Sequence, residues 1–171
     1  MLKMVGHFPD YQFVIAGAPS MTETDYAPYV KDVPVRIIYG DTYRLLSQAR
    51  AALVTSGTAT LETALLRIPQ VVCYNGEGGR LSYYLFKTFV KVKYISLVNL
   101  IFGGEVVREL MMQHLTERNV LNELSRILYS EREREKMLRN YDEIIYRLGP
   151  SGASKHFAEM MVNDLRKDLA L

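Results

Sequence analysis

The stretch AALVTSGTATLETALLRIPQVVCY, residues 51–74, decides the fold. It opens with a short apolar run over 51–55 and closes with a second over 70–74. Short apolar runs of this length are typical of strands that are buried on both faces. Between the two runs, apolar residues recur at helical spacing and stop at Pro69, which cannot continue a helix. The stretch therefore predicts a strand, a helix and a second strand parallel to the first.

The same alternation extends on both sides of this stretch. Further strands are predicted over 12–17, over 35–39 and, from a weaker pattern, over 94–97. A helical apolar face follows Asp41, a typical N-cap residue, and another helix is predicted over 81–89. The fold class predicted is α/β, a Rossmann-like parallel sheet with flanking helices.

The last third of the sequence contains no predicted strand. A short helix is expected over 105–113, and apolar residues at helical spacing predict longer helices over 121–128, over 137–148 and from 157 to the end. We therefore expect two parts in the chain. Residues 1–110 form the Rossmann-like part, and the helices of 111–171 pack on it or on a partner protomer.

Composition limits the classes of protein that this chain can belong to. Its 171 residues, 49% hydrophobic and 23% charged, suit a folded chain and exclude a disordered one. Cys73 is the only cysteine, so an internal disulfide is excluded, and the three histidines lack the spacing of metal ligands. A net charge of +2 is too small to indicate nucleic acid as a partner. No export signal or membrane span is predicted, so we expect a cytoplasmic location.

The most informative polar residues, Ser56, Gly57 and Thr58, lie where the first strand of the opening stretch gives way to its helix. A helix N-terminus offers unpaired N–H groups and partial positive charge, and glycine lets a phosphate approach the backbone closely. One turn into the helix, the Glu62 carboxylate can accept hydrogen bonds from both hydroxyls of a ribose. On the residues alone, an ordinary helix cap followed by an acidic residue stays open as the simpler interpretation.

Two neighbouring segments carry weaker signals. The glycine-rich loop over 76–80 ends in Arg80, a candidate contact to a phosphate or to a donor sugar, with a mobile loop as the alternative. The segment 81–93 combines aromatic residues with lysines. This composition suits a helix lying on an anionic membrane surface, and ordinary packing against the sheet would use the same residues.

Two segments, 51–74 and 93–110, closely resemble the lipid-A-disaccharide synthase family. The more specific pieces are Ser-Gly-Thr-Ala-x-Leu-Glu over 56–62 and Ser-Leu-x-Asn-Leu over 96–100, and the resemblance covers about 9–164. It implies a GT-B glycosyltransferase, in which two Rossmann-like domains face a cleft. Enzymes of this family make the lipid A disaccharide 1-phosphate from UDP-2,3-diacylglucosamine and the acceptor lipid X.

The resemblance also assigns roles to individual residues. It implies that this chain is the part that binds the UDP-sugar donor, with Ser56, Gly57 and Thr58 at the phosphates and Glu62 at the ribose. Asn99 would lie in the same cleft, and Glu105 falls at a family-like position after two glycines. Neither a metal nor another cofactor is expected.

The chain also departs from the family. The N-terminal domain with the catalytic base, the first strand of the donor-binding domain and its Gly-Ser-Arg loop find no counterpart, so we assign no catalytic residue and expect the chain alone to be inactive. The resemblance further implies a peripheral place on the inner membrane and a homodimer formed through the C-terminal helices. Two alternatives stay open. One is a related UDP-sugar epimerase or glycosyltransferase domain, which Asn99 and its neighbours argue against; the other is a non-catalytic helical dimerisation module.

Overall fold

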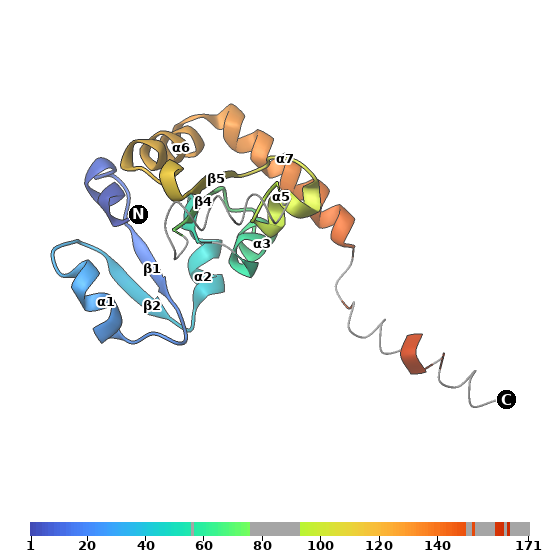
Figure 1. The fold of residues 1–171 in the computed structure, drawn as a ribbon, viewed down its shortest axis with the longest axis horizontal. Coiled ribbons are helices and arrows are strands. Elements are labelled where there is room, and N and C mark those ends of the chain that lie inside the picture. Colours follow the sequence, from blue (N-terminus) through green and yellow to red (C-terminus); the bar gives the residue numbers. More distant parts are fainter. Residues whose placement is uncertain (56, 76–92, 150–151, 153–159, 163, 165–171) are drawn as a thin grey trace.

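The computed structural model describes residues 1–55, 57–75, 93–149, 152, 160–162 and 164 (Figure 1). Within them, parallel strands alternate with helices through the first two thirds of the chain, and two long helices follow. This arrangement confirms the predicted α/β fold class. The helix predicted over 81–89 and most of the one predicted from 157 onwards lie outside the described residues, as do Ser56 and Arg80.

The described strands form two separate parallel sheets. One sheet pairs β1 with β2, and the other has the order β3-β4-β5. In register, Val14 of β1 lies opposite Arg36 of β2, and Val72 of the central β4 lies opposite both Val54 and Glu109. The strand bounds are β1 (Val14–Gly17), β2 (Arg36–Tyr39), β3 (Ala52–Val54), β4 (Gln70–Tyr74) and β5 (Arg108–Met111).

The helices connect these strands and then cover the larger sheet. α3 packs with β4, α5 and α7, while α6 packs on β4, on β5 and on the N-terminal turn η1. The helix bounds are η1 (Leu2–His7), α1 (Glu23–Val30), α2 (Thr42–Ser47), α3 (Thr58–Leu65), α5 (Leu97–Phe102), η2 (Met112–His114), α6 (Glu117–Tyr129) and α7 (Glu131–Leu148).

Four of the predicted strands are confirmed, and two predicted elements are wrong. Residues 94–97 do not form a strand, because Ser96 caps α5 and its hydroxyl accepts a hydrogen bond from the Asn99 N–H at 3.3 Å. The helix predicted over 105–113 is wrong as well, because β5 occupies its middle and pairs with β4. In both places a sheet contact or a cap overrides the local apolar pattern.

Within the described residues the two sheets do not join. Doubly wound folds commonly have the strand order 3-2-1-4-5-6. The pairing of β2 with β1 matches the 3-2 part of that order, and β3-β4-β5 matches the 4-5-6 part. In that order β1 corresponds to strand 2 and β3 to strand 4. Strand 1 lies between these two strands, so they do not pair with each other. β1 and β3 are not paired among the described residues, although the sequence pattern predicts one sheet.

The main core lies around the three-stranded sheet. Its fully buried side chains come from the sheet, from α5 and from the two long helices, and they include Val71, Val72, Val98, Val107, Ile127, Tyr141 and Ile144. The helices predicted over 121–128 and 137–148 are confirmed as α6 and α7, and they bury most of the expected apolar faces, although Leu148 at the end of α7 is exposed. An ion pair between Arg67 and Asp142 joins α7 to the turn between α3 and β4. Among the described residues, no helix has the length and apolarity needed to cross a membrane.

Candidate nucleotide site

The carboxyl ends of β3, β4 and β5 meet at one edge of the larger sheet, because the three strands are parallel. Ligands of open α/β sheets bind outside this edge. After β3 the chain reaches Gly57 and then α3. β4 ends at Tyr74, which is followed by Asn75, and both residues are exposed. The edge therefore presents the start of a helix beside the ends of two neighbouring strands.

Gly57 has a backbone conformation that requires glycine. Its φ is 85° and its ψ is −150°, a region that is essentially open only to residues without a Cβ. A Cβ built on Gly57 would meet no described atom within 4 Å. The glycine is therefore needed for the path of the backbone, and the space in front of it is open to a ligand as far as the described residues define it.

The start of α3 leaves N–H groups available. Because the N-cap is Gly57, no N-cap side chain occupies the N–H groups of Thr58 and Ala59. The buried hydroxyls nearby turn the other way. Thr60 Oγ1 donates to the Gly57 carbonyl at 2.8 Å, and Thr63 Oγ1 donates to the Ala59 carbonyl at 2.7 Å. Thr58 is exposed, so its hydroxyl is the one on this turn that solvent reaches.

Glu62 lies on the same face of α3 as Thr58, since residues four apart are neighbours on a helix surface. Its side chain is half-buried. Within the described part of the chain, no side chain or backbone N–H pairs with its carboxylate. The Glu62 carboxylate therefore lies near the start of α3, and neither of its oxygens accepts a hydrogen bond from a described residue.

A second helix begins close to Gly57. The backbones of Gly57 and Ser96 are paired as an isolated parallel bridge, which brings the start of α5 next to the start of α3. Ser96 is fully buried. Its position is fixed by Glu109 of β5, whose Oε1 accepts from the Ser96 N–H at 3.0 Å and from the Ser96 hydroxyl at 2.6 Å.

Asn99 belongs to the same network. Its side chain is fully buried, and its Nδ2 donates to the Val107 carbonyl at 2.8 Å and to Glu109 Oε1 at 2.9 Å. Its Oδ1 accepts from the N–H groups of Val106 and Val107 at 2.8 and 3.0 Å. The amide thus uses both donors and both lone pairs within the protein. A direct contact between Asn99 and a nucleotide stays a prediction, and the observed hydrogen bonds give this residue a structural role in joining α5 to β5.

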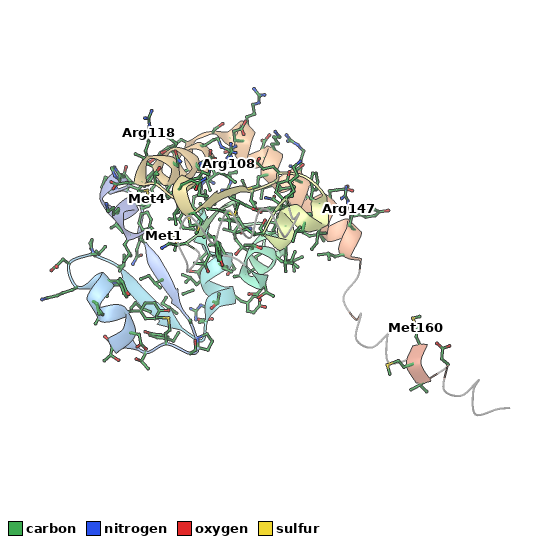
Figure 2. All side chains as sticks on the ribbon, in the orientation of Figure 1. Met1, Met4, Arg108, Arg118, Arg147 and Met160 are labelled. Atoms are coloured by element: carbon green, nitrogen blue, oxygen red, sulfur yellow. The ribbon has the colours of Figure 1, made fainter. Side chains whose placement is uncertain are left out.

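The far end of α5 is held as well. Arg147 of α7 donates from Nη1 to the Phe102 carbonyl at 2.7 Å, and its guanidinium lies 5.1 Å from the centroid of the Phe102 ring. Figure 2 shows Arg147 at the place where α7 passes α5. The helix ends at Gly103 in the left-handed conformation, with φ 79°. Both ends of α5 are therefore fixed, and so is the residue that pairs with Gly57.

Glu105 lies apart from the other candidates. It precedes the amino end of β5, whereas Gly57 follows the carboxyl end of β3, so the two residues are at opposite ends of a parallel sheet. Its carboxylate is exposed and pairs with Arg108 at 3.0 Å. The structure therefore brings together Gly57, Thr58 and Glu62, with Asn99 behind them, but not Glu105. A role of Glu105 at the site stays a prediction.

Two other chemistries find no support near this edge. Burial raises the pKa of the Cys73 thiol to about 11, so at neutral pH it stays protonated and is a poor nucleophile. In the part of the chain that the structure describes, no group of three or more His, Cys, Asp or Glu side chains could hold a metal ion.

Glu109 is the residue near this edge that the sequence pattern missed. A helix is predicted over 105–113 and no role is assigned to Glu109, whereas its carboxylate lies on β5 and faces the start of α5. A signal was present, because Glu109 stands between apolar residues, Val106, Val107 and Leu110, that suit a buried strand. An acidic residue within such a run needs hydrogen-bond donors nearby, and a helix start supplies them.

Comparison with known proteins identifies relatives over most of this chain. The sequence model of the family described as lipid-A-disaccharide synthetase matches residues 3–160. A lipid-A-disaccharide synthase of Nitrosococcus oceani is 33% identical over 156 residues, which cover 90% of this chain and 40% of the relative. The enzyme of the same name from Anaeromyxobacter dehalogenans is 33% identical over 161 residues, covering 92% of this chain and 42% of the relative.

A third relative is more similar over a shorter stretch. The lipid-A-disaccharide synthase of Psychromonas ingrahamii is 38% identical over 128 residues, which cover 71% of this chain and 32% of the relative. The chain thus spans about 40% of the length of the first two relatives.

Proposed function

Because the chain belongs to the lipid-A-disaccharide synthase family, we propose that it forms the donor-binding part of such a glycosyltransferase. The UDP moiety of UDP-2,3-diacylglucosamine binds at the start of α3. The N–H groups of Thr58 and Ala59 and the Thr58 hydroxyl hold the phosphates, and Glu62 accepts hydrogen bonds from the ribose hydroxyls. Ser56 and Arg80 are further proposed contacts, and both lie outside the described residues.

The observation that carries the proposal is the conformation of Gly57. The φ of 85° requires glycine before α3, and because glycine has no side chain, none covers the first N–H groups of the helix, at the edge where open α/β sheets bind ligands. Glu62 then lies one turn further along the helix, without a partner among the described residues. A nucleotide with its phosphates at the start of α3 would therefore place its ribose one turn along the helix, next to Glu62.

The chemistry proposed for this part is stabilisation of the leaving group. When the glycosidic bond of the donor breaks, UDP departs with negative charge on its β-phosphate. Backbone N–H groups and the positive end of α3 stabilise that charge as it develops. We assign the base that accepts the proton of the acceptor hydroxyl to another part of the enzyme, so this chain alone binds the donor without transferring the sugar.

The location of the chain follows from the chemistry of the substrates. In the family both the donor and the acceptor, lipid X, carry acyl chains. We therefore place the chain at the cytoplasmic face of the inner membrane, on an anionic lipid surface. From the family resemblance we also propose that it is a homodimer in the complete enzyme. Co-sedimentation with anionic vesicles checks the membrane contact, and analytical ultracentrifugation checks the dimer.

Isothermal titration calorimetry with UDP tests the proposed site. Wild-type protein is expected to bind UDP, and Glu62→Ala is expected to weaken binding by about tenfold or more, because a single hydrogen bond to a carboxylate is already worth about 1.5–3 kcal/mol. Glu135→Ala is the matched control. Its carboxylate is exposed on α7 and pairs with Arg139. Equal UDP affinities for folded Glu62→Ala and wild type would contradict the ribose assignment.

Ligands with fewer phosphates test the phosphate contacts and the ribose contact separately. UMP and uridine keep the ribose but lose one or both phosphates, so their affinities are expected to fall in the order UDP, UMP, uridine. Glu62→Ala should weaken all three by a similar factor. Equal binding of UDP and uridine would contradict the phosphate assignment at the start of α3.

A further inference from the structure

The start of α5 already holds an anion supplied by the protein. The part-buried Glu109 carboxylate accepts four hydrogen bonds there. Oε2 accepts from the Ile95 N–H at 3.0 Å. Oε1 accepts from the Ser96 N–H at 3.0 Å, from the Ser96 hydroxyl at 2.6 Å and from Asn99 Nδ2 at 2.9 Å. Every partner is a donor, which is the environment of an ionised carboxylate.

This arrangement makes the two neighbouring helix starts chemically different. At α5, Glu109 occupies the donors that precede the helix, and the Ser96 hydroxyl accepts from the Asn99 N–H. At α3, no cap side chain is present, because the N-cap is Gly57. An incoming phosphate would meet negative charge at the first position and free N–H groups at the second. The pair of helices therefore directs an anion to α3.

The same carboxylate reaches Gly57 through the backbone. Ser96 is bonded to Glu109 by both its N–H and its hydroxyl, and its backbone is paired with that of Gly57. Asn99 extends the network to the N–H groups of Val106 and Val107. Glu109 itself lies on β5, the strand beside the central β4. A connected path thus runs from the rigid sheet to the residue that sets the direction of the α3 start.

We infer that Glu109 is a positioning residue for the proposed nucleotide site. It fixes Ser96, and through the Gly57–Ser96 bridge it holds the loop from which the α3 N–H groups point outwards. This inference rests on the proposed function, because it assigns Glu109 to the same site. Glu109 has no contact with the nucleotide in this account; it acts through Ser96 and Gly57.

The conservative variant separates positioning from charge. In Glu109→Gln, the side-chain oxygen can keep the three bonds of Oε1, while the amide NH₂ faces the Ile95 N–H and loses the fourth. Glu109→Ala loses all four. We expect UDP affinity to fall by about tenfold in Glu109→Ala and by about threefold in Glu109→Gln, while Glu135→Ala leaves it unchanged.

Backbone amide NMR supplies the readout that a loss of stability alone would not move. In Glu109→Ala without any ligand, the amide resonances of Ser96, Gly57 and Thr58 are expected to shift, while those of Val71 and Val72 in the sheet stay in place. Glu109→Gln should return the Gly57 and Thr58 resonances most of the way to their wild-type positions. Should Glu109→Ala fail to fold, Glu109→Gln carries the same test with smaller shifts.

The outcomes distinguish this inference from the proposed function. If wild type does not bind UDP, the proposed function fails, and the ligand-free resonances of Gly57 still decide whether Glu109 positions it. Unchanged Gly57 and Thr58 resonances in a folded Glu109→Ala protein would overturn the inference. So would wild-type UDP affinity in that variant, and in that case the proposed function would stand.

Discussion

The two sheets of this molecule differ in burial although both are parallel. The central strand β4 of the larger sheet is fully buried from Gln70 to Cys73, with neighbours on both sides and helices packed around it. In the smaller sheet every residue of β2 is exposed or half-buried, and Ala16 of β1 is exposed. The difference follows from neighbours, because a parallel strand is shielded only when strands flank it and helices cover it.

The candidate site belongs to the better-supported sheet. Gly57, Ser96 and Glu109 all connect to elements that pack on β4, and α5 is held at both ends. A binding site needs groups that stay fixed before the ligand arrives, and rigid elements provide them. We therefore expect the three-stranded region to dominate both the stability of the protein and ligand binding.

The largest difference is expected from a matched pair of isoleucines. Ile127 of α6 is fully buried over the larger sheet, while Ile38 of β2 is 37% exposed. Ile127→Ala is expected to lower the free energy of unfolding by about 2–5 kcal/mol, because it removes buried methyl groups and leaves a cavity. Ile38→Ala should cost less, about 1–2 kcal/mol, since more than a third of the residue is already in solvent. Urea denaturation measures both, and equal losses would contradict the comparison.

The second prediction concerns high pH. Burial raises the pKa of Cys73 in β4 to about 11 from 9.0, so in this pH range the folded state keeps a proton that the unfolded state has lost. The stability linked to this proton is complete below about pH 9 and is lost as pH rises through 11, by about 2–3 kcal/mol for a shift of about two units.

Cys73→Ala isolates this effect. It removes the thiol, so its free energy of unfolding should fall less steeply between pH 9 and 11 than that of wild type. Burial also raises the pKa of Tyr141, which adds a decline above about pH 10 in both proteins. Parallel pH profiles for wild type and Cys73→Ala would show that the thiol is not buried as the structure has it.

The smallest effect is expected in the two-stranded sheet. A Cβ on Gly17 of β1 would lie 2.4 Å from Cδ1 and Cε1 of Tyr39. Overpacking a closed core costs about 1–3 kcal/mol, but the Tyr39 ring is 42% exposed and can turn aside. Gly17→Ala should therefore cost less than about 1 kcal/mol in urea denaturation. A loss as large as that of Ile127→Ala would mean that β1 and β2 are as tightly packed as the main core.

The sequence pattern predicted the buried parts of the fold well. β4 matches its predicted range because an uninterrupted apolar run is buried on both faces. α7 matches because Met137, Tyr141 and Ile144 recur on one helix face. The pattern also located Gly57, Thr58 and Glu62 together, because a loop followed by a helix keeps neighbours in sequence close in space.

The misses arise where contacts between distant residues decide the structure. β5 contains Arg108 and Glu109, and Glu109 can lie in a strand only because the start of α5, more than ten residues away, supplies its donors. The helix α1 was not predicted, although Thr22 and Asp25 form a capping box that marks its start. The split into two sheets depends on which strands pair, and local apolar patterns carry no information about that.

The central claim is that UDP binds at the start of α3. Amide NMR during a titration of the wild-type protein with UDP tests it most directly. Saturable shifts of the Gly57, Thr58 and Ala59 resonances are expected, with Ile15 and Ile37 of the smaller sheet unmoved. Saturating UDP that leaves the resonances at the start of α3 unchanged, or that moves only those of the smaller sheet, would show that UDP does not bind there.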